Sequence, residues 1–256
     1  MGLNTNTRVP SSGRIAIFGT TSGIAREVSR AFVREGHDLV LIGRSAEALR
    51  AEAADLEVRG NRPVPVCVWD LLDRQHHAER FAELVSNTEL SGVFFAAGVL
   101  YPEKDLENDG DLTRHLFDMN LTETIVVLNL FAHHLQRQGG GFLSVLSSVA
   151  GDRGRAANKT YGASKAGLTA YLEGLRAAMQ GTGVRVQTVK PGPVRTPMTD
   201  GYKGPAILLA EPEAVARDIV RGIRSGKAVV YTPGFWRLVM AIIRALPESL
   251  ARKVPG

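Results

Sequence analysis

The chain has 256 residues, 44% of them hydrophobic, and a formal net charge of +5. This length and apolar content suit one large domain with a single core. No apolar run is long enough to span a bilayer, and the basic residues form no stripe interleaved with aromatic residues. We therefore expect neither a transmembrane segment nor a nucleic-acid partner.

The start of the chain and its single cysteine bear on location. Residues 1–13 are polar and lack the apolar segment of a signal peptide, which predicts a flexible N-terminus. Cys67 is the only cysteine, so an intrachain disulfide is excluded, and its apolar surroundings predict a buried strand residue. These features indicate a reducing, cytoplasmic location.

From residue 14 to residue 233, short apolar runs alternate with amphipathic stretches, as in βαβ units. The predicted strands are Arg14–Phe18, Leu39–Ile42, Val64–Trp69, Gly92–Ala96, Gly141–Leu146, Val184–Val189 and Ala228–Tyr231. The predicted helices are Ile24–Glu35, Ala46–Arg59, Arg74–Asn87, Asp111–Arg137, Tyr161–Gln180 and Pro212–Ser225. Right-handed crossovers give a single-domain α/β fold, a doubly wound parallel sheet of the Rossmann type with helices on both faces.

A glycine-rich turn joins the first predicted strand to the first predicted helix. Glycines let the backbone approach a pyrophosphate, and the helix N-terminus offers free N–H groups. The alternative is an ordinary turn, but the strand before it and the helix after it favour dinucleotide binding. The expected contacts are Gly19, Thr21, Ser22, Gly23 and Ile24.

The next two predicted strands end near residues suited to the adenosine half of a dinucleotide. Arg44 follows the second strand, where an arginine suits a 2′-phosphate, so it favours NADP(H) over NAD(H). The alternative is an exposed arginine at a helix start. Asp70 ends the third strand and either accepts a hydrogen bond from the adenine amino group or caps the following helix.

The sequence Tyr161-Gly162-Ala163-Ser164-Lys165 suggests acid–base chemistry. On a helix, positions four apart share one face, so Tyr161 and Lys165 are expected to point into the same cleft. A tyrosine has an ordinary pKa of about 10, and we expect the nearby ammonium to lower the pKa toward neutrality. Ser148 ends the preceding buried strand and would hold a substrate oxygen against the phenol.

These motifs, taken together, resemble the short-chain dehydrogenase/reductase superfamily from Arg14 to about Pro233. The resemblance implies that Asn120 completes a catalytic tetrad with Ser148, Tyr161 and Lys165, kinks its helix and holds a water in a proton relay. It also implies cofactor contacts at Tyr161 and Lys165 and at residues of three further segments of the chain. The segment residues are Asp70, Leu71, Ala97, Gly98, Pro191, Gly192, Val194 and Thr196. Ala25 and Ala96 depart from the usual glycine and asparagine.

Three segments are also similar to a subgroup that includes decaprenylphosphoryl-2-keto-erythro-pentose reductase. They are residues 151–158, residues 194–198 and residues 235–244. The similarity implies a lipid-linked keto-sugar as substrate.

The remaining expectations concern a lid, a tail and the histidines. Residues 197–211 are expected to form a lid over the substrate, within a domain spanning residues 14–233. Residues 234–256 form an amphipathic tail, and its apolar stretch from residue 235 either packs in an oligomer interface or lies on the inner face of a membrane. His76, His77, His133 and His134 are expected at the surface, and no metal is expected.

The sequence thus predicts an NAD(P)H-dependent reductase that transfers hydride between nicotinamide and a ketone or secondary alcohol. The substrate is a small-molecule or lipid-linked ketone. The alternatives are a soluble or fatty-acyl ketone as substrate, or a non-catalytic NADP(H)-binding sensor or scaffold. The apolar surface of the long predicted helices indicates a homo-oligomer.

Overall fold

The computed structural model describes residues 13–86, 88–202 and 204–251. Most of the predicted N-terminal segment, Asn87, Lys203 of the predicted lid and residues 252–256 of the tail lie outside the description. Its strands are β1 (Arg14–Phe18), β2 (Leu39–Gly43), β3 (Val66–Val68), β4 (Leu90–Phe95), β5 (Gly141–Leu146), β6 (Val184–Pro191) and β7 (Val229–Thr232). Its longer helices are α1 (Gly23–Arg34), α2 (Ala46–Gly60), α3 (His77–Ser86), α5 (Gly110–Phe117), α6 (Glu123–Arg137), α7 (Lys159–Ala178), α8 (Pro212–Arg224) and α9 (Trp236–Ala245). Two short helices are α4 (Glu103–Asn108) and α10 (Glu248–Ala251).

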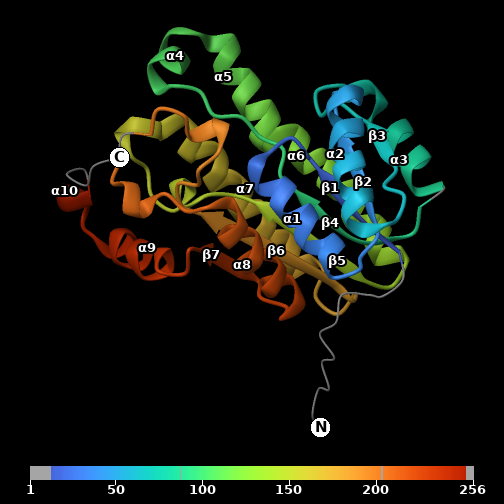
Figure 1. Ribbon diagram of the computed structural model, residues 1–256. Helices are drawn as coiled ribbons and strands as arrows, with labels where there is room; N and C mark the ends of the chain where they lie inside the picture. Colours follow the sequence, from blue (N-terminus) through green and yellow to red (C-terminus); the bar gives the residue numbers. More distant parts are fainter. Residues whose placement is uncertain (1–12, 87, 203, 252–256) are drawn as a thin grey trace.

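The strands form one parallel sheet in the order β3-β2-β1-β4-β5-β6-β7, covered by helices on both sides (Figure 1). On one side, α1, α2 and α8 pack onto apolar residues that alternate along the strands, such as Ile15 and Ile17. On the other side, α3, α6 and α7 pack onto the intervening residues, such as Ala16 and Phe18. The doubly wound fold is therefore confirmed.

Local sequence explains where several helices begin and end. Ser45 caps α2 by accepting a hydrogen bond from the Ala48 N–H (3.2 Å), and Asn61 ends this helix in the left-handed conformation (φ 50°). Pro212 stands at the first position of α8, where its missing N–H has no helical partner to lose. These signals account for helix bounds close to the predicted ones.

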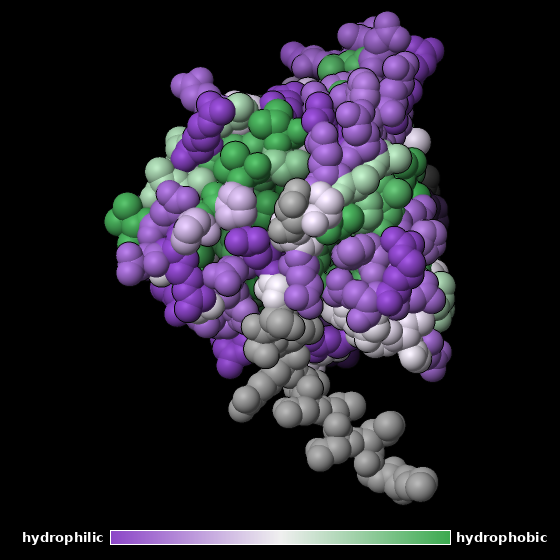
Figure 2. Space-filling view, turned by 90° about the vertical axis from the view of Figure 1, so that its right-hand side faces the viewer, coloured by the Kyte–Doolittle hydropathy of each residue, from purple (hydrophilic) through white to green (hydrophobic). Residues whose placement is uncertain are grey.

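Strand β3 differs from its prediction because it lies at the edge of the sheet. The predicted strand Val64–Trp69 shortens to Val66–Val68, and Val68 is 45% exposed. Cys67 is only partly buried, so its prediction as a buried strand residue was wrong, although burial still raises the pKa of its thiol. Figure 2 looks onto the side of the molecule that carries α2, β3 and α3, and hydrophobic residues gather in the middle of this face.

The strand order reverses between β1 and β4, because β1 pairs with β2 on one side and with β4 on the other. In open parallel sheets, ligands bind outside the carboxyl ends of the strands at this switch point. The fold therefore directs attention to the segments that follow β1, β4, β5 and β6.

Candidate active site

The glycine turn after β1 lies against two other strand ends. Gly19 has a φ of 84°, and a Cβ there would lie 2.6 Å from the Ala97 backbone nitrogen. A Cβ on Gly23 would lie 2.8 Å from Cγ2 of Thr196. Position 19 therefore requires glycine, Gly23 lets α1 approach Thr196 closely, and the segments after β1, β4 and β6 meet here.

The start of α1 fits a phosphate group. Ser22 precedes the helix but makes no capping bond with its side chain, and the first turn contains no acidic residue. The Thr20 side chain is buried beside this turn, and its hydroxyl has no partner among the described residues. Free N–H groups and an unpartnered buried hydroxyl suit an anionic ligand. The prediction named Thr21 and Ile24 here but missed Thr20, because a run of two threonines does not show which one faces inward.

The predicted adenosine contacts lie after β2 and β3. Arg44 is exposed, and no described residue forms an ion pair with it. Asp70 accepts a hydrogen bond from the Leu72 N–H (2.9 Å) within a turn, and Asp73 is the N-cap of the following 3₁₀ helix Arg74–His76, so the capping alternative was wrong. Leu71 is buried. A nucleotide contact at these residues stays a prediction.

The predicted helix Asp111–Arg137 is helical throughout, but a π-helical turn, Asp118–Thr122, joins its two α-helical parts, α5 and α6. Asn120 lies in this turn and is fully buried. Its Oδ1 accepts from the Val99 N–H (2.8 Å), and its Nδ2 donates to the Val99 carbonyl (2.9 Å). The turn thereby ties the helix to the segment after β4, beside Gly98. Such turns redirect a helix at functional sites.

Ser148 and Tyr161 face each other across the loop after β5. Ser148 Oγ accepts from the Ala150 N–H (3.1 Å) and caps the short 3₁₀ helix Val149–Gly151. The hydroxyls of Ser148 and Tyr161 share a hydrogen bond. A Cβ on Gly162 would lie 2.9 Å from the Ala150 carbonyl oxygen, so glycine lets α7 approach this loop closely.

Lys165 follows Tyr161 by one helical turn and is 4% exposed. Its Nζ lies 5.8 Å from the centroid of the Tyr161 ring and donates to the Leu146 carbonyl (3.3 Å). A Cβ on Gly98 would lie 3.4 Å from Nζ and 2.9 Å from Oδ1 of Asn120. The four predicted catalytic side chains therefore gather at the carboxyl ends of β4 and β5.

The protonation of this group differs from the expectation. Burial raises the pKa of Tyr161 to about 12, against the hydrogen bond from Ser148, which lowers it. Burial lowers the pKa of Lys165 to about 8. The predicted lowering of the tyrosine pKa by the lysine was therefore wrong for this structure, because removal from water disfavours the phenolate more than its neighbours stabilise it.

The segment after β6 completes the site. The Gly192 N–H donates to the Thr232 carbonyl (3.0 Å), and Val194 forms a parallel bridge with Ala210. A Cβ on Gly192 would lie 2.0 Å from Nε1 of Trp236. The tail therefore starts against the Pro191–Gly192 turn, and sequence reasoning missed Trp236 because its partner is distant in the chain.

The histidine prediction needs one correction. His77 is 4% exposed: its Nδ1 accepts from the Trp69 indole (3.0 Å), and its Nε2 lies 3.3 Å from Glu123. It therefore stabilises the core on the α3 and α6 side. Within the described ranges, no three His, Cys, Asp or Glu residues are grouped to hold a metal ion, and no helix is long and apolar enough to cross a membrane.

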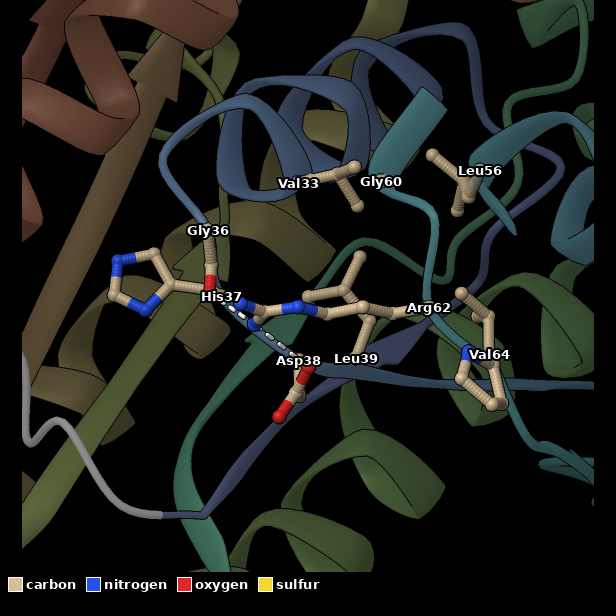
Figure 3. Close-up of a pocket in the computed structure, with 10 residues that line it drawn as sticks. Val33, Gly36, His37, Asp38, Leu39, Leu56, Gly60, Arg62 and Val64 are labelled. Carbon is tan, nitrogen blue, oxygen red and sulfur yellow. Dashed lines mark hydrogen bonds and ion pairs between the residues drawn. The ribbon is translucent and has the colours of Figure 1, made fainter. Parts of the chain in front are cut away.

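A pocket at the start of β2 is separate from this site (Figure 3). Arg62 reaches across it and donates to the Gly36 carbonyl (2.8 Å) and to Asp38 (3.2 Å). The pocket contains none of the four predicted catalytic residues.

Comparison with known proteins decides the family. A family model described as short chain dehydrogenase matches residues 14–204. The chain belongs to this family. An uncharacterized oxidoreductase of Streptomyces coelicolor is 37% identical to this short-chain dehydrogenase over 94% of the chain and 95% of the relative. Another from Mycobacterium tuberculosis is 34% identical over 94% and 96%.

Solved structures agree on the fold of this short-chain dehydrogenase. A short chain dehydrogenase/reductase family protein with 27% identity aligns with a TM-score of 0.75 over 86% of this chain and 96% of that one. A short-chain dehydrogenase from Sphingobium yanoikuyae in complex with NADPH, 22% identical, aligns with a TM-score of 0.78 over 94% and 99%. The protein is therefore an oxidoreductase of the short-chain dehydrogenase/reductase type.

Proposed function

We propose that this short-chain dehydrogenase reduces a ketone to a secondary alcohol with NADPH. The observation that carries the proposal is the gathering of Asn120, Ser148, Tyr161 and Lys165 beside the glycine turn. A bound nicotinamide supplies the hydride, and a tyrosine with a pKa of about 12 is protonated at neutral pH, which is the acid form that reduction requires.

Each of the four side chains has a distinct task. Tyr161 donates its proton to the carbonyl oxygen, and Ser148 donates a hydrogen bond to the same oxygen. Lys165 stabilises the resulting phenolate as an ammonium. Asn120 holds Val99 through both backbone groups and so fixes the wall beside Gly98. The test is NADPH oxidation with a panel of ketones. A protein that binds NADPH but does not oxidise it in the presence of any of these ketones would support the sensor or scaffold alternative.

Reduction should depend on pH through Lys165. Its pKa of about 8 lies below the ordinary 10.5, so the ammonium is present below pH 8 and is lost as the pH rises further. We expect kcat/KM for ketone reduction to fall above about pH 8. Initial rates of NADPH oxidation between pH 6 and pH 10 measure this, and Lys165→Arg should move the fall to higher pH. A profile that stays flat to pH 10 would contradict this role.

We infer that Arg44 selects NADPH over NADH. It follows β2, is exposed, and has no described ion-pair partner, and an arginine binds a phosphate with paired hydrogen bonds. Arg44→Ala should raise the Kd for NADPH roughly tenfold to a hundredfold and leave NADH binding nearly unchanged. Fluorescence titration measures both constants, with Arg50→Ala on the exposed side of α2 as control. An equal effect on the two nucleotides would refute the assignment.

A lipid-linked substrate, such as a polyprenyl-phosphate keto-sugar, is supported by the surface of α9. Phe235, Leu238 and Ile242 are 43%, 68% and 56% exposed and lie along one side of the helix. Arg237 and Arg244 flank them. We infer that this surface contacts the inner face of the membrane and brings such a substrate to the site.

Flotation with anionic liposomes tests the membrane contact. The protein should float with the vesicles, and Leu238→Asp combined with Ile242→Asp should reduce the floating fraction roughly tenfold. Val58→Asp is the control, because Val58 is 86% exposed on α2, outside this surface. If the wild-type protein stays at the bottom, or if the double variant floats as well as Val58→Asp, the membrane contact is refuted and the soluble-ketone alternative is favoured. We also infer a homo-oligomer, supported by Val126, which is exposed on α6.

A further inference from the structure

Three buried polar atoms around the candidate active site have no partner among the described residues. They are Nε of Arg155, Oδ1 of Asn158 and Nε1 of Trp236. Arg155 and Asn158 lie on the loop between Ser148 and Tyr161, and Trp236 begins α9. A buried polar group without a hydrogen bond is destabilising, so each of these atoms is a candidate for a hydrogen bond that a ligand completes.

The position of Trp236 places one of these atoms near the reacting groups. The residue is 7% exposed and packs with Met240 and with Val149, the residue after Ser148. Its Nε1 occupies the place that a Cβ on Gly192 would take. The indole N–H therefore lies between the loop that carries Ser148 and the turn after β6.

Arg155 has no ion pair within the described chain, although an arginine close to it in the sequence and another just before the predicted lid are paired. Arg153 pairs with Glu248 (2.8 Å), and Arg195 pairs with Glu211 (2.8 Å). Asp152, the nearest carboxylate in sequence, is held by Lys190 (2.5 Å) and by the Tyr231 hydroxyl (2.8 Å). Asp152 is therefore already paired with other residues, and Arg155, the second arginine of this loop, has no counter-ion among the described residues.

Arg155 lies close enough to the predicted lid to interact electrostatically with it. Burial lowers the pKa of its guanidinium, and Tyr202 of residues 197–211 opposes that shift. In Figure 1 this orange segment lies beside the yellow start of α7, above the red α9, and its Leu208 packs against the Trp236 cluster. A partly buried cation facing a substrate lid is stabilised when the substrate supplies the negative charge.

We propose that the substrate is a ketone with an anionic group, a phosphate or a carboxylate, that Arg155 binds beneath the lid. The Trp236 N–H donates to a second oxygen of the substrate, and the carboxamide of Asn158 accepts from a substrate hydroxyl. The inference rests on the proposed reductase function and adds the class of substrate. A guanidinium suits this role because its planar fork binds two oxygens of one anion.

Matched pairs of ketones test the proposal. D-ribulose 5-phosphate is compared with D-ribulose, and acetoacetate with methyl acetoacetate, by NADPH oxidation. The wild-type enzyme should prefer the anionic member of at least one pair by tenfold or more in kcat/KM. Arg155→Ala should lower kcat/KM for that anion roughly tenfold to a hundredfold, and that for the neutral member less than twofold. Arg155→Lys should retain part of the preference.

Controls separate anion binding from a general disturbance of the loop. Arg153→Ala removes a paired arginine from the same loop and should leave the preference unchanged. Trp236→Phe keeps an aromatic ring but removes the N–H donor, and should raise KM for both members of a pair. Equal activity on both members in the wild-type enzyme, or an equal loss on both in Arg155→Ala, would overturn the proposal.

A binding measurement distinguishes the proposed anion site from the proposed reductase function. Calorimetric titration of inorganic phosphate into the protein saturated with NADPH should give binding that weakens tenfold or more in Arg155→Ala. If Arg155→Ala weakens phosphate binding but no ketone is reduced, the anion site stands and the reductase proposal fails. If ketones are reduced and phosphate binds both proteins equally, the anion site is refuted and the reductase proposal stands.

Discussion

Replacing Tyr161 by phenylalanine is expected to lower kcat for ketone reduction by roughly a hundredfold to ten-thousandfold. The change removes only the hydroxyl, which hydrogen-bonds with Ser148 and is the proposed proton donor. The ring stays, so its packing beside Lys165 should persist, and the Kd for NADPH should change less than threefold. Steady-state rates and fluorescence titration of NADPH measure the two quantities.

Tyr171→Phe is the matched control for this substitution. Tyr171 lies on the same helix, and its hydroxyl donates to Asn129 (2.8 Å), away from the site. This variant should retain near wild-type turnover. If Tyr161→Phe keeps more than a tenth of the wild-type kcat, another group supplies the proton.

Asp152→Asn is expected to destabilise the fold by about 3–5 kcal/mol, because it leaves the charge of Lys190 buried without its partner. The side chains of Asp152 and Lys190 are 2% and 5% exposed, and their charged atoms are 2.5 Å apart. This pair, with Tyr231, links the loop after Ser148 to β6 and β7. Urea unfolding measures the loss, which is a large part of the stability of an ordinary domain.

A surface pair provides the control for that measurement. Asp111 pairs with Arg114 on α5, and their side chains are 93% and 74% exposed. Asp111→Asn should change the free energy of unfolding by less than about 1 kcal/mol. An Asp152→Asn variant as stable as this control would show that the buried pair does not hold the loop.

Features that depend on local sequence were predictable. The alternation of apolar runs predicted β1 and β5 with their bounds, and the glycines at 19 and 23 predicted the turn after β1. The spacing of Tyr161 and Lys165 placed both on one side of α7. In each case the signal lies within a few residues of the feature, so no knowledge of distant contacts is needed.

Features that depend on distant contacts were not predictable. The hydrogen bond from the Val99 N–H to Asn120 and the burial of His77 beside Trp69 and Glu123 both join residues that are far apart in the chain. The sequence of the tail predicted an amphipathic segment, but only the fold shows that Trp236 fills the space beside Gly192. The pKa of Tyr161 depends on its burial, which residue spacing alone does not report.

The most direct test of the central claim is the fate of deuterium from NADPH labelled at C4 of the nicotinamide. Coenzyme labelled at the 4R position and coenzyme labelled at the 4S position are used separately. After reduction of a ketone that the enzyme accepts, mass spectrometry and NMR should find one deuterium at the new carbinol carbon from only one of the two. The same experiment with Tyr161→Phe should give almost no product. An alcohol product without deuterium from both labelled coenzymes, or labelled product at the wild-type rate from the variant, would contradict the account.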